Sequence, residues 1–167
     1  MDQVFDASAL RTDAPPLVID ATLAAPADAG PPDAAPLPDA HECPADYTED
    51  PVSGHAYRFR RTRVTWDEAV EACEETGEDV HLVTIDDATE LALIHGIVNN
   101  TVVWVGASDS AVEGLFELVT GEPATFLPWA SGEPNNTGNE DCVELIAGEH
   151  FNDQGCSDEH PFVCECE

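Results

Sequence analysis

The sequence contains no lysine and only five arginines among 167 residues, whereas aspartate and glutamate together number 35. The formal net charge is therefore -30 at pH 7. Nucleic-acid binding depends on lysine and arginine side chains that neutralise phosphates, so this composition argues against a nucleic-acid partner. Anionic membranes and sulfated or sialylated glycans are disfavoured for the same reason.

Long apolar runs are missing as well. No stretch approaches the roughly 20 apolar residues of a membrane-spanning helix, so we expect no transmembrane segment. Catalytic signatures are also absent: the sequence has no GxSxG motif, no Cys/His nucleophile pair, no glycine-rich phosphate loop and no HExxH. The sequence therefore predicts a binding protein without enzymatic activity.

The six cysteines all follow residue 42, and none forms a CxxC motif. An even number without metal-binding spacing favours disulfides over a zinc site and indicates an oxidising compartment. The residues after Met1 nevertheless lack the basic and apolar segments of a signal peptide. We expect an extracellular or cell-surface protein, and either the export signal is absent from this sequence or the start is not the native one.

Residues 1–42 differ in composition from the rest. Between Asp6 and Ala40 the dipeptide Asp-Ala occurs six times among prolines. Such a segment buries too little apolar area to offset the entropy of ordering, which predicts a disordered stalk or linker. A dispensable tail is the alternative interpretation. Residues 43–167 are expected to form the folded domain.

Helix signals are clear in two places. Thr65 and Glu68 form a capping box, and apolar residues recur at helical spacing from Trp66 to Cys73. A second helix is expected after Asp87, with apolar residues again at helical spacing. Strands are predicted where β-branched and aromatic residues alternate or cluster, at residues 55–60, 101–107, 114–119, 141–146 and 162–166. A short apolar run lies at residues 81–85.

A long region rich in glycine, proline and asparagine, residues 121–140, separates two predicted strands. A structureless loop of this length usually has a function. It contains EPNNTGNE at 133–140 and is followed by FND at 151–153, and these two stretches hold four of the six asparagines in the chain. Carboxylates and side-chain amides are oxygen ligands that calcium accepts in any mixture, so we predict a calcium site here.

Several ordered motifs resemble the C-type lectin-like domain over nearly all of residues 43–167. They are TWDEAVEAC, HLVTI, VWVGASD, EGLFELVTG, EPNN, EDC, FND and FVCE. The resemblance implies an α+β fold in which two helices flank a mixed, mostly antiparallel sheet. It also implies a long loop stabilised by calcium, and a fold stapled by disulfides.

The resemblance implies two disulfides, Cys73 with Cys164 and Cys142 with Cys156. Cys43 lacks its usual family partner, because that position is Ala56 here. The termini of similar domains lie on adjacent strands, so we predict that Cys43 pairs with the additional Cys166.

Two calcium sites are implied by the resemblance. The principal site would also receive the sugar, through two neighbouring hydroxyls that complete the calcium shell; its residues are Glu133, Asn135, Glu140, Asn152 and Asp153, and the first four also contact the sugar. The second site would share Glu140; its other residues are Asp109, Glu113, Asn136 and Asp141. Pro134 corresponds to a cis proline in the family.

The EPN motif in similar lectins accompanies neutral sugars with vicinal equatorial 3- and 4-hydroxyls. These include mannose, glucose, N-acetylglucosamine and, in equivalent geometry, fucose. Binding of one sugar is expected to be weak, so multivalent surface display would raise avidity. The alternative hypothesis is a protein-recognition or structural domain that uses calcium only to order its loop.

Three smaller expectations complete the sequence analysis. Trp104 and Trp129 are expected in the core, and the arginines from Arg58 to Arg63 are expected to form salt bridges with the acidic surface. A glycan on the sequon at Asn135 would occupy the calcium site. Together with the tail composition and the missing lysine, this favours a bacterial exported protein.

Overall fold

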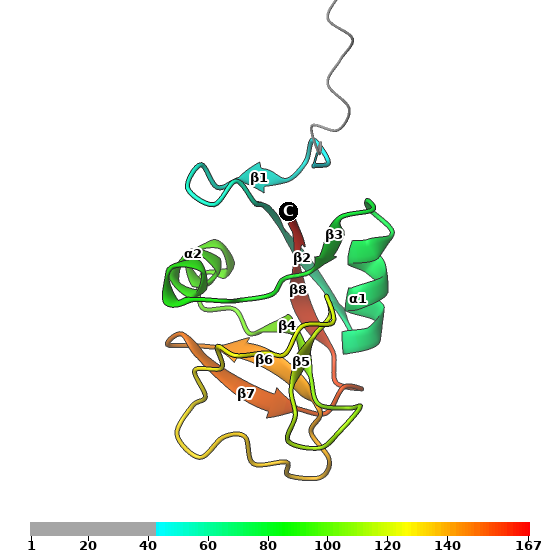
Figure 1. Ribbon diagram of the computed structural model, residues 1–167, viewed down its shortest axis with the longest axis vertical. Coiled ribbons are helices and arrows are strands. Elements are labelled where there is room, and N and C mark those ends of the chain that lie inside the picture. The colour runs from blue at the N-terminus through cyan, green and yellow to red at the C-terminus, as the bar shows by residue number, and fades with distance from the viewer. Residues whose placement is uncertain (1–42) are drawn as a thin grey trace, which may run out of the picture. The chain divides into compact units, whose positions relative to one another are not determined.

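The computed structural model describes residues 43–167, so the predicted stalk over residues 1–42 lies outside the described residues. The described part contains helices and strands in the order given next (Figure 1). They are β1 Thr48–Glu49, β2 Ala56–Val64, α1 Trp66–Glu74, β3 Val80–Leu82, α2 Ala88–Val98, β4 Val103–Ser108, β5 Glu117–Leu118, β6 Cys142–Ile146, β7 His150–Gln154 and β8 His160–Cys166.

The strands form one mixed sheet in the order β1-β2-β8-β4-β6-β7, with β3 added on β8 and β5 on β4. The β4–β8 pair is parallel and the other pairs are antiparallel. The two helices lie on either side of the central strands β2 and β8 (Figure 1). The expected α+β fold with a mostly antiparallel sheet is confirmed.

Side-chain alternation along β8 explains why two helices are needed. Phe162 and Cys164 belong to a buried cluster that includes Ala69 and Cys73 of α1. Val163 belongs to a second cluster, which α2 covers with Leu91, Ile94 and Val98. Because successive strand residues point to opposite faces, both faces of β8 are apolar and both must be covered.

Both helices begin where the sequence predicts. The Thr65 side chain accepts from Glu68 N, and the Glu68 carboxylate accepts from Thr65 N, which completes the capping box of α1. In α2 the Asp87 side chain accepts from Thr89 N at 2.7 Å and from Glu90 N at 3.0 Å. Such caps satisfy backbone N–H groups that have no partner inside the helix.

The strands differ from prediction in three places. The expected strand at 114–119 is reduced to Glu117–Leu118, and β1 was not predicted. Strand β7 was also missed, because His150–Gln154 is polar apart from Phe151 and has no clear alternation. β7 matters most of the three, since it pairs with β6 and carries Asn152 and Asp153.

Three disulfides staple the domain, in the pairs expected from the sequence. They join Cys43 to Cys166, Cys73 to Cys164 and Cys142 to Cys156. Trp104 is fully buried, as predicted. Trp129 is only half-buried and packs against Phe116 and Phe151, so it lines the edge of the core rather than its centre.

Within residues 43–167, neither helix combines the length and the apolar character needed to cross a membrane.

Candidate functional site

The long loop is tied to strand β7 by the buried carboxylate of Asp153, which is 1% exposed. Its Oδ1 accepts from the backbone N–H of Asn135 at 3.0 Å, and its Oδ2 accepts from that of Asn136 at 2.6 Å. The pairing of β6 with β7 places Asp153 opposite Val143, beneath the loop. One predicted ligand therefore holds the backbone of two others.

Glu133, Asn135 and Glu140 are linked by a chain of side-chain contacts. The Asn135 amide donates to the Glu133 carboxylate across Pro134, whose peptide bond with Glu133 is cis. The backbone N–H of Thr137 lies 2.8 Å from Asn135 Oδ1 and 2.9 Å from Glu140 Oε2. The structure thus brings three of the five residues predicted for the principal site into one surface cluster.

Asn152 is oriented by a buried neighbour. Its Nδ2 donates to Glu144 Oε1 at 3.0 Å across the β6–β7 pair. Because the amide nitrogen is directed toward Glu144, the amide oxygen is directed away from it. Its described side-chain hydrogen bond is with Glu144, and not with Glu133, Asn135 or Glu140.

The sequence analysis predicted no role for Glu144, which lies beside Asn152. It is 5% exposed, and burial raises its pKa although the hydrogen bond from Asn152 lowers it. His160 Nε2 lies 3.2 Å from Glu144 Oε2. An acid in the middle of the apolar strand CVELI was the available signal, since buried acids usually have a partner.

The second predicted site is centred on Asp109, which is 3% exposed. Its Oδ2 accepts from Gly114 N at 2.7 Å, and its own N–H donates to Asp141 O at 3.0 Å. The other oxygen, Oδ1, is buried and has no hydrogen-bond partner. Asp109 and Asp141 are therefore adjacent.

The remaining residues of the second site are less closely joined. Asn136 Oδ1 accepts from Glu140 N at 2.8 Å, which places the residue shared by both sites beside Asn136. Glu113 is exposed in the turn that precedes Gly114. No described contact links Glu113 to Asn136 or to Asp141.

The donor set fits calcium. A buried carboxylate oxygen without a partner costs free energy, and Asp109 Oδ1 is such an atom. A hard cation that binds six to eight oxygens would satisfy it and relieve the repulsion among the surrounding acids. The predicted ligands supply carboxylate and side-chain amide oxygens, which are ligand types that calcium accepts.

Calcium is expected to stabilise the domain. With free calcium at about a hundred times its dissociation constant, the free energy of unfolding should rise by about 2.7 kcal/mol over the chelated protein. Differential scanning calorimetry with calcium, with chelator and with magnesium would measure it. Magnesium should have the smaller effect, because it dehydrates reluctantly. A midpoint that is the same in all three buffers would contradict the prediction.

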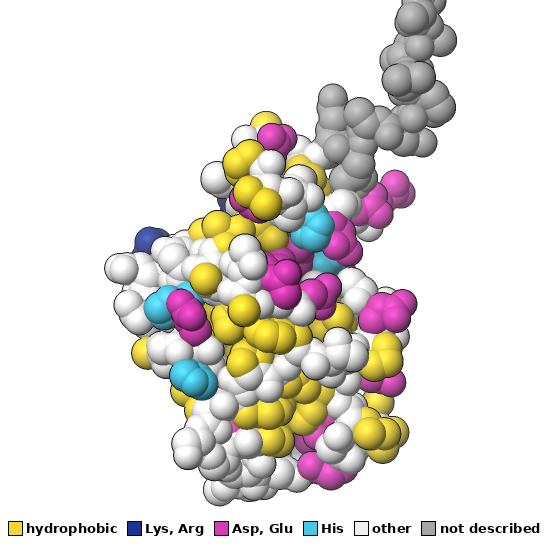
Figure 2. Space-filling model, turned by 60° about the vertical axis from the view of Figure 1, so that its left-hand side comes forward, with side chains coloured by type: hydrophobic (Ala, Val, Ile, Leu, Met, Phe, Trp, Pro, Cys, Tyr) yellow, Lys and Arg dark blue, Asp and Glu magenta, His cyan; other side chains and the backbone are white. Residues whose placement is uncertain are grey.

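The described surface carries few basic side chains. Figure 2 shows acidic side chains spread over the visible face and few basic ones. Arg58 forms an ion pair with Asp46, Arg63 donates to the carbonyl of Glu159, and Arg61 lies over the ring of Phe59. The expected salt bridge to the acidic surface is thus present for Arg58.

Comparison with known sequences gives a consistent result. The family model described as Lectin C-type domain matches residues 62–166. The chain is 32% identical over 126 residues to C-type lectin domain family 4 member M of Nomascus concolor, covering 74% of this chain and 31% of that protein. It is 31% identical over 127 residues to Lectin BRA-3 of Megabalanus rosa, covering 74% of this chain and 78% of that protein. The chain spans about a third of the first relative's length.

Solved structures with the same fold include sugar-binding and other domains. The carbohydrate-recognition domain of mouse scavenger receptor C-type lectin has a TM-score of 0.68 and 28% identity, covering 75% of this chain and 96% of that chain. The carbohydrate-recognition domain of cow CD23 was solved in the presence of a GlcNAc2Man3 oligosaccharide. It has a TM-score of 0.67 and 28% identity, covering 75% of this chain and 95% of that chain. A Ca2+-dependent type II antifreeze protein, with a TM-score of 0.67 and 23% identity over 75% of this chain and 100% of that chain, shows the fold alone.

Proposed function

This chain belongs to the C-type lectin domain family, and on that premise we propose that it is a calcium-dependent carbohydrate-binding module without catalytic activity. The observation that carries the proposal is the contact chain from Glu133 through Asn135 to Glu140, held to β7 by buried Asp153. It gathers acids and amides within one loop, in a domain whose family is generally calcium-binding. Calcium, when bound there, supplies a receptor for two sugar hydroxyls.

The residues of the site have separate roles in this proposal. Asp153 holds the loop backbone through two N–H groups, so that the side chains flanking Pro134 stay together. Glu144 directs the amide oxygen of Asn152 away from itself. The acid and amide pairs then each give a sugar hydroxyl one acceptor and one donor. The EPN motif favours mannose, glucose or N-acetylglucosamine, which have vicinal equatorial 3- and 4-hydroxyls, or fucose, which presents two hydroxyls in equivalent geometry.

A glycan array tests the proposal. The oxidised protein should bind glycans that end in mannose, N-acetylglucosamine or fucose when calcium is present. Chelator should abolish that signal, and restoring calcium should return it. Galactose-terminated glycans on the same array are the matched control and should give little signal. Binding that persists in chelator would contradict the proposed role of calcium.

The second candidate function is a domain that binds calcium but does not bind sugar. Val112 and Leu115, 56% and 63% exposed, lie in the turn on either side of Glu113, beside the second predicted calcium site. Contiguous exposed apolar patches can mark protein contacts, and these two side chains are the apolar ones exposed beside that site. A protein-recognition or structural domain would show calcium-dependent stability in calorimetry, yet no signal on the array in either buffer.

We place the module outside the cytoplasm, where three disulfides are stable. Surface display of several copies would raise a weak affinity for one sugar through avidity. The bacterial source expected from composition stays a prediction, and it draws no support from the relatives compared above, which are animal proteins.

A further inference from the structure

An apolar groove lies beside the loop that carries the proposed sugar site. Its volume is about 490 Å³. Residues around β5 and residues of the long loop line it together, at the end of the domain away from the C-terminus (Figure 1). Most of its lining is apolar and includes Leu115, Phe116, Leu127, Trp129 and Pro134. The sequence analysis predicted no role for this groove.

Two aromatic rings in the lining are held in place by packing. The ring centroids of Phe116 and Trp129 are 4.9 Å apart, and Trp129 also packs edge-on against Phe151 at 6.3 Å. Both lining rings are nevertheless only half-buried, and Leu115 is 63% exposed. A ligand in the groove would therefore remove apolar surface from water, which is favourable.

The groove offers few hydrogen-bonding groups to a ligand. Ala124 N donates to Phe116 O at 3.0 Å, and Trp129 N donates to Leu127 O at 2.8 Å, so these backbone groups are already paired. In the described part of the chain, Glu117 is the one charged residue of the lining. A second sugar ring would need partners for its hydroxyls, whereas a hydrocarbon chain needs none. The lining therefore favours a hydrocarbon.

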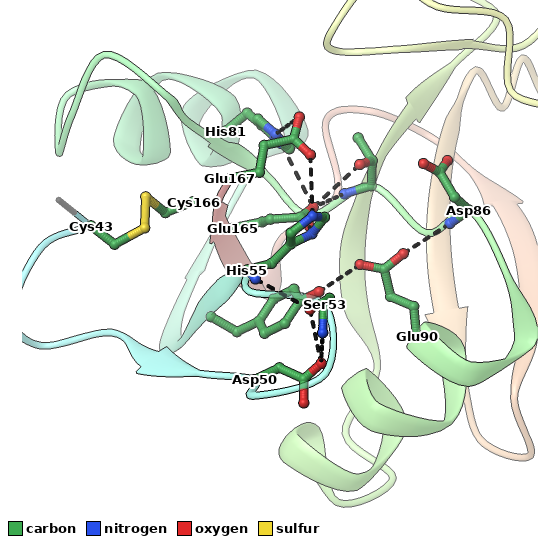
Figure 3. A network of polar contacts seen from close by, with 12 residues as sticks. Cys43, Asp50, Ser53, His55, His81, Asp86, Glu90, Glu165, Cys166 and Glu167 are labelled. Carbon is green, nitrogen blue, oxygen red and sulfur yellow. Dashed lines mark hydrogen bonds and ion pairs between the residues drawn. A yellow bond between two sulfur atoms is a disulfide. The ribbon is translucent and has the colours of Figure 1, made fainter. Parts of the chain in front are cut away.

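A cavity beside α2 shows the contrast. Its lining includes His55, Tyr57 and Glu90, and among the described residues none that lines it belongs to 121–140. The Tyr57 hydroxyl donates to Glu90 Oε1 at 2.7 Å (Figure 3). His55 Nδ1 lies 2.7 Å from Oε1 of buried Glu165. These polar contacts make that cavity unsuitable for a hydrocarbon.

The apolar groove adjoins the proposed sugar site. Pro134, which lines the groove, lies between Glu133 and Asn135, two of the residues proposed to contact the sugar. Gly114, another lining residue, donates to Asp109 Oδ2 at 2.7 Å, so the groove also borders the second predicted calcium site. A glycoside held by Glu133 and Asn135 can therefore extend into the groove.

We propose that the groove receives the apolar aglycone of a neutral glycoside, such as the alkyl or acyl chain of a glycolipid, while the sugar binds at the calcium loop. This inference rests on the proposed function, because it needs the sugar site. The net charge of -30 and the carboxylate of Glu117 repel an anionic chain such as a free fatty acid. The substrate class is thus a neutral sugar that carries a long apolar chain.

Competition by methyl and octyl mannosides tests the groove with the full oxidised chain in calcium. Each glycoside, in both anomeric forms and below its micellar concentration, displaces the protein from immobilised mannose. At least one octyl anomer should inhibit at a tenfold lower concentration than its methyl counterpart, because burial of about two methylenes gives a factor of roughly ten. Octyl galactoside is the control for the chain alone and should inhibit far less than octyl mannoside.

The outcomes separate this inference from the proposed function. Equal inhibition by methyl and octyl mannosides would overturn the groove and leave sugar binding intact, and it would favour a protein contact at this surface. Equal inhibition by octyl galactoside and octyl mannoside would overturn the joint binding of sugar and chain. If neither mannoside inhibited, the proposed function would fail, and the aglycone site would fail with it.

Leu115→Asn tests the location of the chain. Leu115 and Val112 are exposed in the same turn, 63% and 56%, but of the two only Leu115 lines the groove. Leu115→Asn should remove most of the octyl gain and leave inhibition by methyl mannoside unchanged. Val112→Asn is the matched control and should keep the full gain. Urea unfolding checks that both variants are folded, and a full octyl gain in Leu115→Asn would show that the chain binds elsewhere.

Discussion

Glu140→Gln should abolish calcium-dependent sugar binding. Glu140 is the one residue that belongs to both predicted calcium sites, and its contacts reach Thr137 and Asn136 within the loop. The substitution preserves size but removes a charged ligand from each ion. Loss of an outer-shell partner of a metal costs roughly 10 to 100-fold in affinity, so loss of a direct, shared ligand should cost at least that.

The measurement is calcium titration calorimetry combined with retention on immobilised mannose. Glu122→Gln is the matched control, since it makes the same chemical change in the same long region and lies outside both predicted sites. It should retain calcium and mannose binding at the wild-type level. If Glu140→Gln bound calcium as tightly as wild type, the assignment of this loop as the calcium site would be wrong.

Gly106→Ala should strongly destabilise the fold. A Cβ at this position would collide with the carbonyl oxygen of Leu82 and approach Val119 Cγ2 to 2.9 Å. The Leu82 backbone cannot move away easily, because β3 pairs with β8, and Gly106 N donates to Val83 O at 2.7 Å. Overpacking a well-filled core typically costs about 1 to 3 kcal/mol, and a backbone collision should place this variant at about 3 kcal/mol or above.

Gly96→Ala is the matched control for this substitution. Gly96 lies inside α2, and a Cβ there meets nothing within 4 Å. Alanine should raise the free energy of unfolding by up to about 1 kcal/mol, because glycine is a poor helix former. Urea unfolding of the oxidised proteins in calcium measures both changes. Equal stability of the two variants would show that Gly106 is not a packing constraint.

Sequence patterns were sufficient where the physics is local. The capping residues Thr65, Glu68 and Asp87 identified both helix starts, because the capping hydrogen bonds join residues that are at most three positions apart in the sequence. The motif around Pro134 indicated calcium chemistry, because oxygen-rich side chains cluster within a few positions. Strand β7 was missed for the opposite reason: its place depends on pairing with β6 rather than on its own apolar pattern.

The sequence by itself determined the domain type, the helix positions and the oxygen-rich composition of the long loop. Only the tertiary structure decided which distant side chains meet. Asp153 binds the loop backbone, Glu144 orients Asn152, and Glu165 lies against His55. In each case the pairing of strands brings together residues that are not neighbours in the sequence. Such contacts leave no periodic trace in a sequence, because they join residues that are neighbours only after the sheet has formed.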